Sequence, residues 1–584
     1  MKMKQLLLGA TVATAASVLL AAPAVHAQDY SFQRLISLAD YVFGQHHGHH
    51  HRGGSVAPSD IAWTQGAADR IATATPIKHL VIIYDENVSF DHYFATYPKA
   101  ANLSGEPAFN AQSGTPKVNN LSNADLLNNN PNTNPANGDG ASAPFRLDRS
   151  QAATADQNHA YTAEQQAYDG GKMDLFPKYT GAGSPGGAGA FGTTGQVMGY
   201  YDGNTVTALW NYAQHFAMSD NAWTNTYGPS TPGALEAVSG NTDGMQIIAS
   251  SKSSYYVTNT INGQPDHTMI NDVDPGYDVC SSKTNQAMMT GANIGDLLDA
   301  AGITWGGFMG GFDLNATNAN GTTGCGRSTV SQVVGEAVSD YIPHHNWFQY
   351  FASTANPNHL RPSGLVDVGY TYDHDRKPDP ANHEYDLNDF YHAVAAGNFP
   401  AVSYIKLPAY QDGHAGYSDP LDEQSGLVKL INFLQQQPGW RNTAIIITWD
   451  DSDGWYDHAF ATPSSSSFDT VADQLNGAGK CGNGSQPTGL LGQPVNGRCG
   501  PGTRLPFFVI SPWARSNYVD HTLISQASIV SFIEDNWLRG QRLGGGSFDA
   551  QNQSILGMFD FRHGRPARPL LLNANTGEVV ASAH

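Results

Sequence analysis

The feature that most constrains the fold is a short apolar run that ends in two adjacent acids. Residues 443–458 read TAIIITWDDSDGWYDH, and Ala444–Thr448 has the apolar, β-branched character of a buried strand. Asp450 and Asp451 follow where that strand should end. In open α/β sheets, ligands bind beyond the carboxyl ends of the strands. Because adjacent carboxylates repel each other, this stretch alone leaves open a solvated polar turn or a cation site.

A second strand end, far away in the sequence, carries similar groups. Residues 77–94 read IKHLVIIYDENVSFDHYF, in which Leu80–Tyr84 is the strand and Asp85, Glu86 and Asn87 follow it. Carboxylate and amide oxygens are ligands for hard divalent ions such as Mg²⁺, Ca²⁺ or Mn²⁺, with Zn²⁺ less favoured. The two strand ends together predict a divalent-metal site whose ligands are Glu86, Asn87, Asp450 and Asp451.

These two strings resemble a known family. Glu86–Phe94 (ENVSFDHYF) and Asp450–His458 (DDSDGWYDH) are similar to motifs of the phosphoesterase family of bacterial phospholipases C and AcpA-type acid phosphatases, within the alkaline-phosphatase-like superfamily. The resemblance runs from about Ile77 to about Trp537 and is closest to the acid phosphatase branch. Val88 departs from the pattern, since many members carry Arg there. The resemblance implies a three-layer α/β/α fold with a central, mostly parallel sheet, plus insertions or a small subdomain.

The rest of the chain alternates strands and helices, which predicts a large α/β domain. The expected strands include 304–309, 401–407 and 505–511, and the expected helices are 204–218, 387–394, 427–436 and 525–537. Asp386 would cap the second of these helices, and Asp520 would cap the last. We expect the catalytic domain to span 76–565, with insertions near 100–145, 251–345 and 460–500, and a tail at 566–584.

Residues 228–232 (GPSTP) precede a helix expected at Gly233–Val238. Pro232 suits a first helical turn, and Ser230 or Thr231 would cap the helix at its electropositive end. A helix cap is the ordinary interpretation of such a serine, and a hydroxyl nucleophile is the functional one. The family has its nucleophile in this Gly-Pro-Ser/Thr turn, Thr in the phospholipases and Ser in the phosphatases. The resemblance therefore implies that Ser230 is the nucleophile.

Histidines at four positions are candidate catalytic groups by the same resemblance. His159 precedes a helical stretch that begins at Thr162, and His414 follows the strand 401–407, at a third strand end. His344 and His345 follow Pro343, and the sequence does not distinguish between them. Ordinary surface or helix-flanking histidines remain an alternative interpretation at these positions.

Three functions are compatible with these parts. The first is an exported, metal-dependent acid phosphatase that cleaves small phosphomonoesters through a phosphoserine, with His414 or His159 protonating the leaving alcohol. The second is a phospholipase C that cleaves phosphodiester head groups, for which Trp210, Tyr227 and Trp455 would contact lipid and choline. The third is an exported binding protein that a metal stabilises and that has no catalysis.

The N-terminus predicts export. Residues 1–27 have a basic start, an apolar middle and small residues before a cleavage point after Ala27, as in a secretory signal peptide. Such a leader predicts a periplasmic or secreted protein, and no later apolar run approaches transmembrane length. Residues 28–75 are a His-rich segment that we expect to be a disordered linker.

Cysteine content and charge add two expectations. The four cysteines favour the sequence-neighbour disulfides Cys280–Cys325 and Cys481–Cys499, with other pairings open. The formal net charge of −21 argues against a nucleic-acid partner. It also repels a phosphorylated substrate, so a metal or local cationic groups would be needed to bind one.

Overall fold

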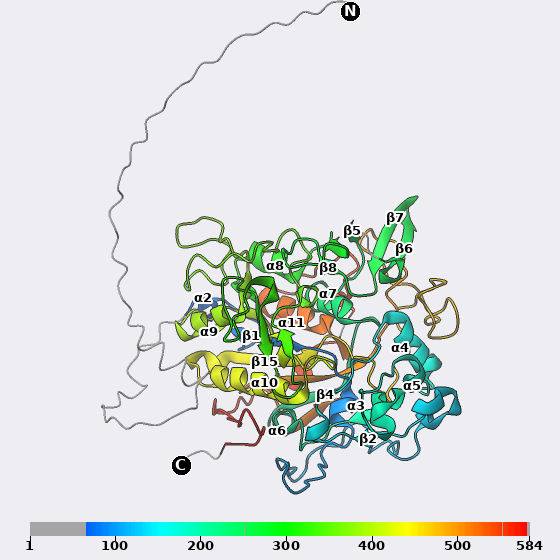
Figure 1. Cartoon of the computed structure of the whole chain (residues 1–584). Helices are drawn as coiled ribbons and strands as arrows, with labels where there is room; N and C mark the ends of the chain where they lie inside the picture. Colours follow the sequence, from blue (N-terminus) through cyan, green and yellow to red (C-terminus); the bar gives the residue numbers. More distant parts are fainter. Residues whose placement is uncertain (1–65, 250–251, 552, 581–584) are drawn as a thin grey trace, which may run out of the picture. The chain divides into compact units, whose positions relative to one another are not determined.

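The computed structural model describes residues 66–249, 252–551 and 553–580 (Figure 1). These residues belong to the unit Ile61–His584, and only that unit is described. The expected signal peptide at 1–27 and residues 28–65 of the expected linker lie outside the described residues.

A nine-stranded sheet forms the centre of the fold. Every strand expected from the sequence is present in it, and β16 alone runs against its neighbours. Near-continuous apolar sequence suits strands that are buried on both faces of a parallel sheet. The order is β13 (Glu384–Asp386), β10 (Trp305–Met309), β14 (Val402–Lys406), β1 (His79–Asp85), β15 (Thr443–Trp449), β16 (Arg504–Ile510), β4 (Ala217–Trp223) and β17 (Tyr518–Asp520), with β18 (Ile524–Ser525) also paired to β4.

Helices cover both faces of this sheet (Figure 1). The hydroxyls of Tyr84 and Tyr404 donate to backbone carbonyls of α7 on one face, whereas Trp449 Nε1 donates to Glu423 of α10 on the other. The expected three-layer α/β/α fold is therefore confirmed. The first face carries α7 (Ser230–Ser239), α8 (Ile294–Ala301) and α11 (Ala527–Trp537), and the second carries α6 (Thr207–His215), α9 (Leu387–Ala395) and α10 (Pro420–Gln435).

Several segments outside the sheet are longer and less regular. The 100–145 segment contains only short 3₁₀ turns and the two-residue β2. The 251–345 segment is only partly an insertion, because α8 and β10 within it belong to the core. The remaining elements are α2 (Ala67–Arg70), α3 (Phe90–Phe94), α4 (Tyr161–Tyr168), α5 (Phe176–Tyr179), β2 (Phe145–Arg146), β3 (Gly199–Tyr200), β5 (Met245–Ala249), β6 (Tyr256–Ile261), β7 (Gln264–Met269), β8 (Asp274–Pro275), β9 (Gln286–Met289), β11 (Ser328–Val330) and β12 (Ala337–Ser339).

Both expected disulfides are present, Cys280–Cys325 and Cys481–Cys499. The second lies in the 460–500 segment, where both sulfurs are buried in a core cluster beside α4. Among the described residues, no helix combines the length and apolarity needed to cross a bilayer.

Some expected boundaries are wrong. Residues 66–75 pack on the domain, since α2 buries Ala68 and Thr75 hydrogen-bonds to Asn536 of α11. The tail also packs, because Leu572 is buried and pairs with Asn432 of α10. Neither segment shows periodicity in its sequence. Helix α2 is only four residues long, and the tail makes its contacts from irregular backbone. Asp520 ends β17 and does not cap α11, whereas Asp386 caps α9 as expected.

The second halves of the two family strings form a buried ionic cluster. His458 Nδ1 lies 2.5 Å from Asp91 Oδ2, and the Arg504 guanidinium contacts Asp457 at 2.9–3.1 Å. The Asp91 amide also donates to Asp457 at 3.1 Å. Opposite charges thus balance where water is excluded, as buried ion pairs require. The cluster joins α3, the loop after β15 and the start of β16.

We expect His458→Gln to lower the free energy of unfolding by about 1–3 kcal/mol, since the buried Asp91 carboxylate loses its charged donor. Burial opposes the charged ring, but Asp91 outweighs it and raises the pKa of His458. The stabilisation is therefore complete below the unfolded pKa of about 6.5 and is lost as pH rises through the higher folded pKa. Urea unfolding at acidic and alkaline pH measures this difference.

The matched control is His563→Gln, because the His563 side chain is 82% exposed beside Asp560. It should leave the unfolding free energy almost unchanged at both pH values. A loss in His458→Gln that is equal at both pH values would show that the ion pair is not its cause.

Candidate active site

Two neighbouring parallel strands deliver the four predicted metal ligands to one place. Asp85 of β1 pairs with Trp449 of β15, so the residues that follow them emerge side by side. The backbone N–H of Asn87 donates to Asp450 Oδ1 at 3.1 Å, and the backbone N–H of Val88 donates to the Asp451 carbonyl. Glu86, Asn87, Asp450 and Asp451 are all buried. The structure therefore brings the four residues together.

The Ser230 hydroxyl lies against the same group. Its Oγ donates to Glu86 Oε2 at 3.0 Å and lies 3.3 Å from Asp451 Oδ2 and 3.5 Å from Asn87 Oδ1. Helix α7 begins at Ser230 itself and Pro229 is its N-cap, without a side-chain capping bond. The expectation that Ser230 or Thr231 caps this helix is therefore wrong. The hydroxyl is directed instead at the carboxylates.

Helix α7 begins at Ser230 because its first turn packs closely on the loop that carries Asp450 and Asp451. A Cβ on Gly233 would lie 2.2 Å from the Asp450 carbonyl oxygen, so the first turn of α7 directly contacts the backbone of a predicted ligand. Glu164 of α4 accepts hydrogen bonds from both the turn before α7 and the loop after β15. Its Oε2 accepts from the Gly228 amide at 2.9 Å, and its Oε1 accepts from the Ser452 hydroxyl at 3.0 Å. The nucleophile turn and the ligand loop are thus held by one side chain.

One orientation of the Asn87 side-chain amide fits a cation among these oxygens. Its oxygen faces Glu86 Oε2 at 2.8 Å and Asp450 Oδ1 at 3.1 Å, and turning the amide over would direct that oxygen at His414 Nε2, 3.0 Å away. However, His414 Nδ1 already contacts the Ala415 carbonyl, and burial lowers the pKa of His414 to about 4. A neutral ring with its proton on Nδ1 has an accepting Nε2, which needs the amide nitrogen.

The carboxylates point the same way. Burial and the Asp450 carboxylate raise the pKa of Glu86 well above its ordinary value, and burial does the same for Asp451. Buried oxygens that face one another need protons or a cation between them. A set of carboxylate, amide and hydroxyl oxygens fits a hard divalent ion.

The histidines after Pro343 are now distinguished. His345 Nδ1 lies 3.0 Å from Glu86 Oε1, and the ring is buried. His344 is farther out, with 29% of its side chain exposed, and its Nδ1 lies 3.4 Å from Asp274. The short 3₁₀ turn at Pro343–His345 directs the two rings differently. His345 therefore contacts the ligand group, and His344 lies at its rim.

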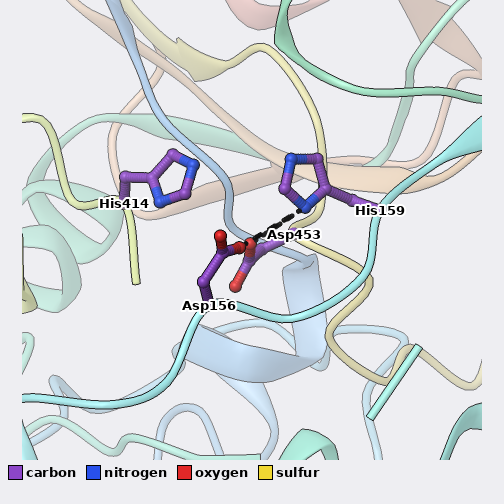
Figure 2. A group of neighbouring side chains, drawn as sticks. All are labelled: Asp156, His159, His414 and Asp453. Atoms are coloured by element: carbon purple, nitrogen blue, oxygen red, sulfur yellow. Dashed lines mark ion pairs between the residues drawn. The ribbon is translucent and has the colours of Figure 1, made fainter. Parts of the chain in front are cut away.

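His159 and His414 lie close together, beside Asp156 and Asp453 (Figure 2), and the His414 ring also lies 6.4 Å from the His345 ring. The spacing of these four side chains could hold a cation. Their hydrogen bonds favour a different role, because His159 Nδ1 contacts the Gln157 carbonyl at 2.8 Å and Asp453 at 3.2 Å. Both rings are thereby oriented with Nε2 toward Asn87, at 3.4 Å from His159.

The charges of these two rings differ. Burial disfavours the His159 cation, but Asp451 and Asp453 outweigh it and raise the pKa of His159 well above its ordinary value. His414 has no such carboxylate in contact, so burial dominates there. The pKa values of the two rings are therefore shifted in opposite directions.

One lysine in the site was not predicted from the sequence. Lys406 is the last residue of β14, its side chain is 2% exposed, and its Nζ contacts Glu86 Oε1 and lies 3.6 Å from Asp450 Oδ2. Burial opposes its charge, but Glu86, Asp450 and Asp412 outweigh it and raise its pKa. Its position at the end of an apolar run gave no sign of these contacts, which depend on the pairing of β14 with β1. Glu164, Asp412 and Asp453 were also missed as site residues.

The aromatic residues expected to contact a head group do not line the site. Trp210, Tyr227 and Trp455 are all buried in core clusters. Trp210 Nε1 donates to the Tyr93 carbonyl, which fixes it in the core. That expectation is wrong, because size and apolarity suit these side chains equally well to packing.

Comparison with known proteins identifies the family of the chain. The Phosphoesterase family profile matches residues 77–538. The chain belongs to the Phosphoesterase family.

Relatives with curated names are phospholipases C. Non-hemolytic phospholipase C of Pseudomonas aeruginosa is 24% identical over 500 residues, which cover 83% of this chain and 57% of that protein. Phospholipase C A of Mycobacterium tuberculosis is 24% identical over 469 residues, covering 77% of this chain and 71% of that one. The chain thus spans little more than half of the Pseudomonas relative. A solved structure, a protein in the alkaline phosphatase superfamily from Vibrio parahaemolyticus, is 10% identical with a TM-score of 0.25 and covers 71% of this chain and 76% of that one.

We expect divalent metal to stabilise the chelator-treated protein, because a cation offsets the repulsion among buried carboxylates. A ligand at a hundredfold excess over its Kd adds about 2.7 kcal/mol to the unfolding free energy. Glu86→Gln and Asp450→Asn should lose most of this gain, whereas the exposed Asp125→Asn should keep it. Thermal unfolding across a Mn²⁺ titration measures the effect. An equal gain in all four proteins would place the metal elsewhere.

Proposed function

We propose that this protein is a metal-dependent phosphoric ester hydrolase whose nucleophile is Ser230. The observation that carries the proposal is the 3.0 Å contact of the Ser230 hydroxyl with Glu86, inside a buried group of hard oxygen ligands. Family membership supports the same reaction class. A hydroxyl held among ligands at a helix start suits attack on phosphorus.

The chemistry follows from the positions of these residues. A divalent ion held by Glu86, Asn87, Asp450 and Asp451 would lower the pKa of the Ser230 hydroxyl and offset charge on the phosphoryl oxygens. Ser230 Oγ forms a bond to phosphorus as the ester oxygen leaves, and water then cleaves the phosphoserine. Two displacements give overall retention at phosphorus.

The leaving alcohol needs a proton. His159 and His414 both present Nε2 to Asn87, so both are candidates for the proton donor. The contact of His159 Nδ1 with Asp453 supports His159, because a carboxylate partner orients the ring and stabilises its cation. We therefore assign the proton donor to His159 and a supporting polar contact to His414.

We propose small phosphomonoesters as the substrates. Ser230 is only 1% exposed, and the site opens past partly exposed histidines, which suits a small substrate. Serine at the nucleophile position also matches the phosphatase branch. The names of the relatives favour the alternative, phospholipase C activity on phosphodiesters. A non-catalytic binding protein has less support, because Ser230 and all four ligands converge.

We also propose that the protein is exported, to the periplasm or outside the cell. Two disulfides suit an oxidising compartment. The signal-peptide pattern at residues 1–27 agrees with this.

Ser230→Ala should lower hydrolysis of p-nitrophenyl phosphate by several orders of magnitude and keep metal binding, because it removes only the nucleophile. The control is Ser516→Ala, at an exposed serine far along the chain. Assays use p-nitrophenyl phosphate and its phosphorylcholine diester, with and without chelator. Preference for the diester would move the assignment to phospholipase C, and activity surviving in Ser230→Ala would remove the nucleophile assignment.

His159→Gln should slow an alkyl phosphate about 10²–10⁴-fold and p-nitrophenyl phosphate much less, since p-nitrophenolate leaves without a proton. His414→Gln should affect both esters alike. Comparing kcat for the two esters separates proton donation from general damage. Equal losses for both esters in His159→Gln would contradict its assignment.

A further inference from the structure

We propose that Lys406 is a permanent second cation of the active site and stands where a second divalent ion would otherwise bind. The inference rests on the proposed role of Glu86 and Asp450 as metal ligands. It adds a positioning residue that neither the sequence motifs nor the family strings include. Lys406 lies on β14, next to β1 in the sheet.

In both Glu86 and Asp450, one carboxylate oxygen faces Lys406 and the other has different partners. Glu86 accepts from Ser230 through Oε2, while its Oε1 contacts Lys406 Nζ. Asp450 accepts the amides of Asn87 and Asp451 through Oδ1, while its Oδ2 faces Lys406 at 3.6 Å. One ammonium therefore contacts the outer oxygen of Glu86 and lies near that of Asp450. Their inner oxygens remain directed at Ser230 and Asn87.

The surroundings of Lys406 have the composition of a metal site. Glu86, His345 and Asp412 offer ligand atoms that lie within 4.8 Å of one another. His345 Nδ1 lies 3.0 Å from Glu86 Oε1 and 3.9 Å from Asp412 Oδ2. The ammonium contacts the same Glu86 oxygen as His345 does. A carboxylate–imidazole group thus surrounds a lysine instead of an ion.

Charge gives the physical reason. Asp85, Glu86, Asp412 and Asp450 all lie buried around Lys406. In the described part of the chain, no other lysine or arginine pairs with Glu86 or Asp450. The Lys406 Nζ also lies 5.7 Å from the Tyr84 ring centroid, which favours a cation. A tethered ammonium offsets these charges at any metal concentration, whereas a second ion would do so only when bound.

The test is metal stoichiometry. Proteins are equilibrated with Mn²⁺, passed through a desalting column and analysed for metal per chain, with electron paramagnetic resonance to detect coupled Mn²⁺ pairs. We expect a single ion in wild type and a second, coupled ion in Lys406→Ala, where Glu86, His345 and Asp412 become free to bind it. The double variant Lys406→Ala/Asp412→Asn should return to a single ion, as should Lys406→Arg.

The control is Lys429→Ala, at an exposed position of α10, which should bind a single ion. A coupled ion pair in wild type would overturn the proposal, and so would a single ion in Lys406→Ala, whatever its activity. If Lys406→Ala does not fold, Lys406→Ser serves instead, and the wild-type stoichiometry still decides. Wild type that binds no metal, with activity intact in Ser230→Ala, would instead overturn the proposed function.

Discussion

The repulsion among Glu86, Asp450 and Asp451 is the constraint on which the rest of the site depends. The parallel pairing of β1 with β15 forces these carboxylates together, and burial removes the water that would screen them. Every nearby feature reduces that cost. Backbone amides donate to Asp450 Oδ1, Lys406 contacts Glu86 Oε1, and the remaining oxygens suit a divalent ion.

The two family strings combine two physical roles. Their first halves leave the ends of β1 and β15 and build the oxygen group. Their second halves turn away and form the ionic cluster of Asp91, Asp457 and His458 with Arg504. Arg504 belongs to β16, the strand that runs against its neighbours. The cluster therefore anchors both ligand loops to a third strand, so that ligand geometry depends on residues that touch no ligand.

The sheet and the ligand set could be predicted because each depends on local sequence. Ile445, Ile446 and Ile447 mark a buried strand without reference to any partner, and acids at its end mark the edge where ligands collect. Lys406 could not be found this way. Its role depends on the register that sets Ile405 beside Ile83 and so brings the end of β14 level with β1. A lysine at the end of an apolar run carries no sign of its neighbours.

Other misses have the same origin in long-range contacts. The expectation that Ser230 caps the helix came from local propensity. In the structure Gly233 packs on the Asp450 backbone, and the helix begins at Ser230 itself. The choice between His344 and His345 depends on one turn that the sequence does not orient. The packing of the tail could not be predicted from the sequence, because Leu572 contacts α10 from irregular backbone.

The exposure of the site residues suggests a direction of approach for the substrate of the proposed reaction. On one side, Lys406, His345 and Asp412 are buried and close the site. On the other, His159 is 13% exposed and Asp156 is 58% exposed, so a substrate has to approach past these residues. An in-line displacement puts the leaving oxygen across phosphorus from Ser230 Oγ, and therefore toward that opening. In the proposed mechanism the alcohol would depart beside His159, while the Lys406 ammonium would stay beside Glu86.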